Sequence, residues 1–226
     1  MSVVTNSVID CVSATDPMMK EGEKRVREFG PYYRTIDYLS RALLPHKVVI
    51  AGGAIRDMFM VGEHMIKDYD VWVLGVDEGI DVALDQKLRE VYEHTAGVAA
   101  AHPNFITKDY EKLFFGRPRF NIVLPWVPEG RPTQIMYSPV KTMAELVSAF
   151  DWRACSFGFD GNELITDGTA DFDNKQLSLN DTKLGSPRNT LRRGFRIEEK
   201  YRYSPTPWRL WLTNELILGL AAMLTF

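Results

Sequence analysis

Two aspartates in the first third of the chain have a spacing that suits phosphate chemistry. Asp68 and Asp70 open the segment Asp68–Leu74, whose aromatic and β-branched residues and period-two alternation predict a strand. Side chains two residues apart on a strand share one face, so the two carboxylates lie side by side and need a cation to offset their repulsion. Mg²⁺ is the natural cation, because it binds through one or two carboxylates together with substrate phosphates. The alternative is a strand edge with two solvated acids.

A pair of glycines upstream of these aspartates could hold a phosphate. Gly52 and Gly53 separate a short β-branched run, His46–Ala51, from Ala54–Val61, which predicts one or two helical turns. A turn between strand and helix exposes backbone N–H groups at the positive end of the helix, where phosphates bind. The Lys-Ser/Thr pair of the P-loop and the G-x-G-x-x-G spacing of dinucleotide folds are missing, so those two loops are excluded. A glycine pair by itself also fits a tight turn that only glycine can make.

Together the two features form a longer sequence pattern. A-G-G-A-I-R-D at residues 51–57 is followed by K-D-Y-D-V-W-V at residues 67–73. This pattern resembles the signature of the DNA polymerase β-like nucleotidyltransferase superfamily, and most closely its branch of class II tRNA CCA-adding enzymes and bacterial poly(A) polymerases. In that branch, G-G-x-x-R-D precedes an acidic D-x-D strand. The resemblance covers residues 47–165, and residues 185–202 more faintly.

The resemblance implies a role for each of these residues. Asp68 and Asp70 would be catalytic and would ligate two metal ions, Mg²⁺ or alternatively Mn²⁺. The implied nucleotide-binding residues of the turn and the helix are Gly52, Gly53, Arg56 and Asp57. The sequence leaves open whether Arg56 neutralises phosphate or pairs with Asp57.

The superfamily normally supplies a third carboxylate from a neighbouring strand, and here the resemblance is weaker. The two candidate strands offer amides instead, Asn121 in Phe120–Leu124 and Gln134 in Thr133–Tyr137. The best substitute is Asp151 in F-D-W-R-A-C, which is similar to the D-F-T-x-N-A block of the class II enzymes. Asp151 is therefore a candidate catalytic residue that binds or supports the metal, with a helix-end cap or a structural acid as the alternative.

A basic segment near the C-terminus could bind a polyanion. Residues 187–201 are similar to the Arg-bearing helical segment that follows the catalytic sheet in class II enzymes. Helical spacing puts at least two of its three nucleotide-binding candidates on one face: Arg192, Arg193 and Arg196. Such a stripe could hold triphosphate oxygens or an RNA backbone. The alternative is a solvated face stabilised by Glu198 and Glu199.

The composition fits a folded protein without a global basic field. Of the 226 residues, 45% are hydrophobic and 25% are charged, and the formal net charge is −3. These values exclude a disordered chain and a uniformly basic nucleic-acid-binding protein. The charge is uneven, however, because residues 181–210 contain eight basic and three acidic side chains. A polyanion would therefore be bound locally.

Cysteine content and the two ends of the chain indicate where the protein works. Cys11 and Cys155 are too few for a disulfide framework or a cysteine-based zinc cluster, and the N-terminus does not read as a secretory signal. We therefore expect a cytoplasmic protein. The apolar stretch Leu216–Phe226 is shorter than the ~20 residues of a membrane-spanning helix. It predicts a packed helix or a self-association surface, with a membrane-surface helix or a loose tail as alternatives.

The predicted elements amount to an α+β fold, with a small mixed β-sheet, flanking helices and a short helical C-terminal part. Periodicity predicts helices from near Pro31 to Leu43, over 80–94 and over 139–150, and strands over 120–124, 133–137 and 153–159. We divide the chain into a nucleotidyltransferase catalytic domain with an N-terminal helix, residues 1–165, and a helical C-terminal extension, residues 166–226.

Together these features predict that the protein is a Mg²⁺-dependent transferase. It would move a nucleoside monophosphate from an NTP, such as ATP, to an acceptor hydroxyl and release pyrophosphate. The class II resemblance and the basic segment favour an RNA 3′ end as acceptor, as in tRNA processing. Transfer to a protein or a small molecule is one alternative. Gln134 and the altered F-D-W-R block motivate another, a degenerate nucleotide- or RNA-binding module. A compact chain without the usual accessory domains suits a phage genome.

Overall fold

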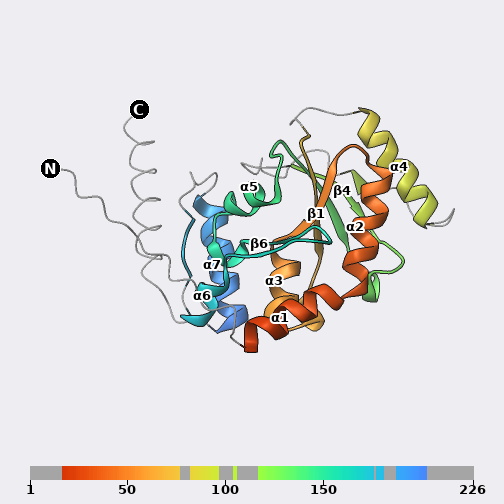
Figure 1. Ribbon diagram of the computed structural model, residues 1–226. Helices are drawn as coiled ribbons and strands as arrows, with labels where there is room; N and C mark the ends of the chain where they lie inside the picture. Colours follow the sequence, from red (N-terminus) through yellow and green to blue (C-terminus); the bar gives the residue numbers. More distant parts are fainter. Residues whose placement is uncertain are drawn as a thin grey trace, which may run out of the picture.

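The fold is built from a central sheet with helices on both sides, and Figure 1 shows α2 and α4 on one side and α5 and α7 on the other. The computed structural model describes residues 17–76, 82–96, 104–105, 117–175, 177–180 and 187–202. The helices are α1 (Pro17–Glu28), α2 (Gly30–Ala42), α3 (Gly53–Met60), α4 (Val82–Ala96), α5 (Met143–Ser148), α6 (Thr169–Asp173) and α7 (Pro187–Tyr201). The strands are β1 (Lys47–Ala51), β2 (Tyr69–Leu74), β3 (Asn104–Phe105), β4 (Arg117–Ile122), β5 (Thr133–Ser138), β6 (Phe157–Phe159) and β7 (Leu164–Thr166).

The sheet has seven strands in the order β3-β4-β5-β2-β1-β6-β7. β2 and β5 run parallel, and every other neighbouring pair is antiparallel. A mixed sheet with flanking helices confirms the predicted α+β fold class. The strand, glycine turn, helix and acidic strand predicted from the sequence are β1, α3 and β2, and they lie at the centre of this arrangement.

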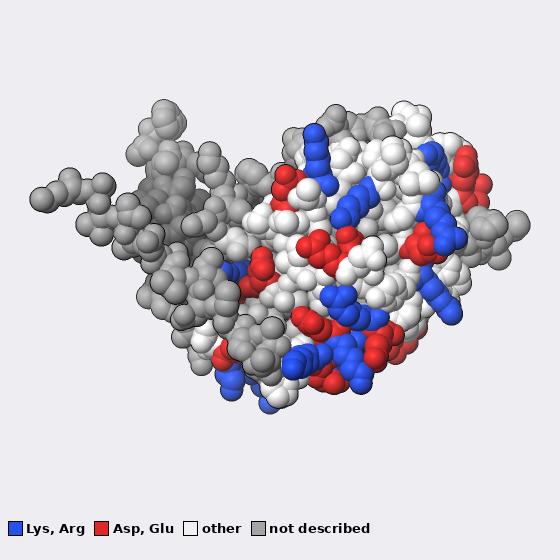
Figure 2. Space-filling model, in the orientation of Figure 1, with Lys and Arg blue, Asp and Glu red and all other residues white. Residues whose placement is uncertain are grey.

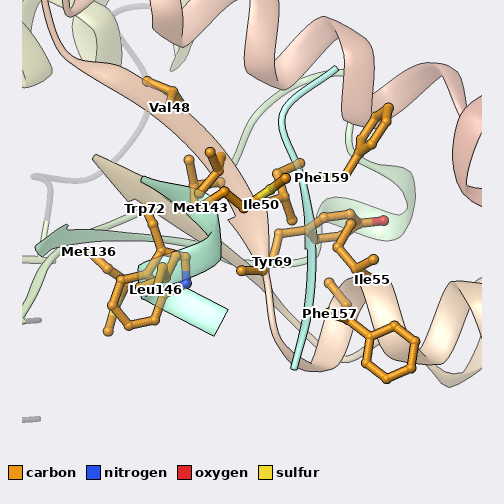
Figure 3. Close-up of a cluster of buried hydrophobic side chains, with 14 of the residues drawn as sticks. Val48, Ile50, Ile55, Tyr69, Trp72, Met136, Met143, Leu146, Phe157 and Phe159 are labelled. Atoms are coloured by element: carbon orange, nitrogen blue, oxygen red, sulfur yellow. The ribbon is translucent and has the colours of Figure 1, made fainter. Parts of the chain in front are cut away.

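Residues of β2 alternate between two buried layers. The ring of Tyr69 packs edge-on against Tyr32 of α2, with ring centroids 5.7 Å apart. The ring of Trp72 lies on the other face, where it packs against Phe150 at 5.9 Å. In Figure 3, Trp72 lies beside Met136 of β5 and Leu146 of α5. Because Asp70 is two residues from Trp72, its carboxylate is on the face that α5 covers.

Two predicted elements differ from the structure. The helix predicted over 139–150 is limited to α5, because Thr142 caps it in a reciprocal capping box with Glu145. The strand predicted over 153–159 begins as a 3₁₀ turn, η3 (Arg153–Cys155), and only β6 is extended. The N–H of Cys155 donates to the carbonyl of Trp152 at 2.8 Å, which closes this turn.

The helical segment predicted over residues 187–201 is α7, and it packs on the sheet domain. Trp152 forms an isolated β-bridge with Leu179, and Ile197 of α7 is part of the hydrophobic core. In the described ranges, no helix has the length and apolarity needed to cross a bilayer. Cys11 and the predicted helix at Leu216–Phe226 lie outside the described residues. The division at residue 165 remains a prediction.

Candidate active site

The turn between β1 and α3 is shaped by Gly52. Its φ of 85° and ψ of −135° lie in a region that L side chains avoid. A Cβ at Gly52 would stand 3.6 Å from the ring of Phe150 and 4.0 Å from Oδ2 of Asp70. The turn therefore brings the start of α3 to the Asp70 carboxylate. The first intrahelical bond joins Arg56 N–H to the Gly52 carbonyl at 3.1 Å, so the N–H groups of residues 53–55 have no acceptor within the helix.

Asp68 and Asp70 form a partly buried carboxylate pair at the start of β2. Burial and the charge of Asp68 raise the pKa of Asp70 to about 7, although Arg193 and Arg56 oppose this rise. Burial, followed by the charge of Asp57, also raises the pKa of Asp68. No hydrogen bond or ion pair from the described part of the chain satisfies either carboxylate. This donor set fits a divalent cation such as Mg²⁺, which would offset the repulsion.

The row of residues beside Asp70 contains amides. Asp70 is in register with Gln134 of β5, and Gln134 is in register with Asn121 of β4. Residues in register share one face of a sheet, so Gln134 is the immediate neighbour of Asp70 on the adjacent strand, β5. Over the described ranges, no group of three His, Cys, Asp or Glu side chains could hold a metal ion. A cation here would take two carboxylates and complete its shell with substrate and water oxygens.

Arg56 and Asp57 pair with each other beside the glycine turn, where Nη2 of Arg56 would lie 3.4 Å from a Cβ at Gly53. Nε of Arg56 donates to Oδ1 of Asp57 at 2.9 Å, and both side chains are buried. Of the two roles left open for Arg56, the structure shows the ion pair. The hydroxyl of Tyr201 also donates to Oδ1 of Asp57, and Nζ of Lys200 binds Oδ2. Asp57 therefore connects α3 to the last turn of α7.

The same end of α7 also contacts the segment that leads into the acidic strand. Nζ of Lys200 donates to the carbonyl of Met65 at 2.9 Å. Met65 ends the 3₁₀ turn η1 (Glu63–Met65), three residues before Asp68. Sequence reasoning missed Lys200 and Tyr201. Their only signal is helical spacing, because they lie seven and eight residues after Arg193 and so fall on its side of α7.

The carboxylate of Asp151 is bonded within the protein. Its Oδ1 accepts the N–H of Trp152 at 2.9 Å and pairs with Nη1 of Arg193 at 2.5 Å. Its Oδ2 accepts the hydroxyl of Thr190 at 2.8 Å. Thr190, a third residue that sequence reasoning missed, thus joins Asp151 to the first half of α7. The structure places Asp151 in this network, and its predicted metal role stays a prediction.

The three candidate arginines of α7 divide into inward and outward positions. Arg193 is half-buried against Asp151, whereas Arg192 and Arg196 are exposed. Arg196 nevertheless acts electrostatically on Asp68, because it lowers the pKa of that carboxyl against the effect of burial. Glu198, proposed as a partner on a solvated face, is buried, with 3% of its surface exposed. Only part of the basic stripe is therefore a solvated face.

Solved structures show which class of protein has this fold. The chain is similar to a CCA-adding enzyme determined with CTP, with a TM-score of 0.52 and 15% identity over 83% of this chain and 41% of that one. It is also similar to the Thermotoga maritima CCA-adding enzyme complexed with tRNA, with a TM-score of 0.52 and 14% identity over 87% of this chain and 45% of that one. The fold is that of nucleotidyltransferases, and the chain spans less than half the length of these two proteins.

A family assignment comes from the sequence. The family described as Gabija anti-defense 2 family protein matches residues 23–176, which is more than half of the chain. The chain therefore belongs to the Gabija anti-defense 2 family. None of the curated proteins compared with the chain matches it. The matched region includes β1, α3, β2, β5 and Asp151, and it ends before α7.

Proposed function

We propose that the protein is a Mg²⁺-dependent nucleotidyltransferase that transfers a nucleoside monophosphate from an NTP to an acceptor hydroxyl. The observation that supports this most strongly is the Asp68 and Asp70 pair, partly buried, raised in pKa and placed beside the first turn of α3. A carboxylate pair with no bonded partner among the described residues is costly to the folded state unless a cation binds it. A helix N-terminus next to that pair is suited to the phosphates that would accompany the cation.

The chain's own residues have separate roles in this proposal. Asp68 and Asp70 hold Mg²⁺, or alternatively Mn²⁺, which when bound supplies charge neutralisation at the reacting phosphate. Gly52 and Gly53 let the backbone approach the triphosphate, and Arg193 of α7 supplies positive charge near it. The acceptor hydroxyl releases its proton to water and its oxygen forms a bond to the α-phosphorus. The bond from that phosphorus to the bridging oxygen of the β-phosphate breaks, and pyrophosphate leaves.

An RNA 3′ end is our first choice of acceptor. The support is the fold, which is that of CCA-adding enzymes, and the exposed position of Arg192 and Arg196, which can contact a phosphate backbone. The outward arginines lie on the helix that is bonded to the candidate site. Backbone phosphates would thus be held within reach of the carboxylate pair.

A protein acceptor is the second candidate, and the family supports it. A family named for countering the Gabija defence suits a protein that modifies or binds a Gabija component, and such a protein also suits a phage. On the face seen in Figure 2, basic and acidic side chains are interspersed, and no broad basic surface suited to a long RNA is formed there. A mixed surface of this kind is compatible with a protein partner.

The experiment follows the label from each of four NTPs radiolabelled at the α-phosphate. The protein is incubated with Mg²⁺ and total RNA, or with purified Gabija proteins, and products are separated as RNA and protein. We expect label in one of the two pools, and its loss in Asp68→Ala and Asp70→Ala variants that keep their fold. Label in protein and none in RNA would reject the first acceptor. NTP binding without pyrophosphate release under any condition would reject catalysis and leave a binding module.

A further inference from the structure

Asp151 has the bonding pattern of a positioning residue. Its two oxygens receive three donors, the Trp152 amide, the Thr190 hydroxyl and the Arg193 guanidinium. Its backbone carbonyl accepts the N–H of Asn180 at 3.0 Å, so the main chain is fixed as well. A carboxylate that ligates a metal needs an oxygen directed at the ion. Here both oxygens are directed at α7 and the adjacent backbone.

Arg193 is held in one orientation by this arrangement. Thr190 and Arg193 are three residues apart on α7, so they face the same side and reach the same carboxylate. The indole N–H of Trp152 donates to the Thr190 carbonyl at 2.9 Å, which ties this part of α7 to the segment before β6. One nitrogen of the guanidinium binds Asp151, and a guanidinium carries further N–H donors in a fixed fork.

The guanidinium is bonded to Asp151, the residue after Phe150, and the ring of Phe150 lies 3.6 Å from a Cβ built at Gly52 in the phosphate turn. Arg193 interacts electrostatically with Asp70 as well as with Asp151, so its charge lies near both. The side chain keeps 28% of its surface exposed, which leaves room for a ligand. An NTP triphosphate carries more negative charge than a cation on Asp68 and Asp70 would neutralise. A fixed guanidinium beside that pair suits the remaining phosphate oxygens.

We propose that Arg193 binds the phosphates of the NTP and that Asp151 is the residue that positions it, with no metal-ligand role of its own. This inference rests on the proposed function, since it assigns the triphosphate contact of that same site. It places the triphosphate between the first turn of α3 and the inward side of α7. Arg192 and Arg196, which are exposed, are then left for the acceptor.

The test separates metal binding from nucleotide binding. Mn²⁺ alone is titrated and followed by electron paramagnetic resonance, and NTP with Mn²⁺ is titrated by calorimetry, for wild type, Asp151→Asn, Arg193→Ala and the double variant. We expect unchanged Mn²⁺ affinity in all four proteins. NTP affinity should fall about tenfold in each single variant, and the double variant should bind no more weakly than Arg193→Ala. Asp160→Asn, which breaks the Lys47 ion pair at the opposite end of β1, is the matched control with wild-type affinities.

Chemical rescue distinguishes positioning from a purely structural role. Millimolar guanidinium should restore NTP binding to Arg193→Ala, and should fail to restore it when Asp151→Asn is added, because the ion then has no anchor. Arg193→Lys should be only partly active in binding, since an ammonium lacks the fork. Circular dichroism and melting curves check that each variant is folded. If Asp151→Asn does not fold, the Arg193 variants still test the phosphate contact, because the Arg193 side chain is partly exposed.

Three results would overturn the inference. A tenfold loss of Mn²⁺ affinity in Asp151→Asn would make Asp151 a metal ligand. Wild-type NTP affinity in a folded Arg193→Ala variant would mean that the Asp151–Arg193 ion pair only holds α7 in place. A lack of guanidinium rescue would mean the same. A wild-type protein that binds Mn²⁺ but no NTP would instead refute the proposed function itself, and that outcome is visible before any variant is made.

Discussion

Replacing Asp70 with asparagine is expected to stabilise the protein when no divalent cation is present. Burial and the charge of Asp68 raise the pKa of Asp70 from 3.8 to about 7. Three pKa units correspond to about 4 kcal/mol, and because Asp70 is only partly buried we expect a gain of about 2–4 kcal/mol. Between these two values the native state holds a proton that the unfolded chain has released. Wild-type stability therefore falls as pH rises from about 4 to about 7, and Asp70→Asn removes this fall.

The assay is urea unfolding of wild type and Asp70→Asn in EDTA at several pH values. The two free energies of unfolding should be similar near pH 4 and differ most above pH 7. Millimolar Mg²⁺ should narrow the gap, because the cation binds only the native wild-type pair. Asp173→Asn, at an exposed position of α6, controls for loss of one acidic charge. A variant that is less stable than wild type above pH 7, or a gap that does not change with pH, would refute the reasoning.

Two further predictions concern the residues around the turn. Gly52→Ala should lower the free energy of unfolding by about 1–3 kcal/mol, because alanine disfavours a φ of 85°. Gly30→Ala is the control and should cost little, because nothing lies within 4 Å of a Cβ at that position. Equal losses of stability in urea unfolding would contradict the strain at Gly52. Asp57→Ala should cost about 3–5 kcal/mol, because it leaves the buried Arg56 without its counter-ion. The comparison is Asp37→Ala, which breaks an exposed ion pair and should cost under about 1 kcal/mol in the same assay.

The centre of the fold could be predicted because its signals are local. The β-branched run, the glycine pair and the alternation after Asp68 each report on a few neighbouring residues, and they fix β1, α3 and β2 in order. Gln134 was also identified as an amide in place of an acid, and the parallel pairing of β5 puts it in register with Asp70. Helix α1 was not predicted, because it is highly charged and only Gly22 and Val26 in it are buried. Strand β7 has three residues, too few for a pattern.

The contacts of α7 could not be predicted from the sequence. Lys200 and Asp57 are 143 residues apart, and Thr190 and Asp151 are 39 residues apart. Any of the 27 basic residues could in principle pair with any of the 30 acidic ones. Only tertiary packing selects the partners. For the same reason, the sequence identified Arg193 as a candidate without showing that it is directed inward.

The two attachments of α7 determine how much of the chain is needed to make a folding unit. One end of the helix supplies the hydroxyl and guanidinium that satisfy Asp151, and the other supplies the ammonium and phenol that satisfy Asp57. A fragment ending at residue 176, where the family match ends, would leave both carboxylates without those partners. Buried carboxylates deprived of their partners cost several kcal/mol. We therefore expect a fragment that ends before α7 to be less stable than one that extends to Tyr201, so a gene fusion that carries the sheet is best made with this helix included.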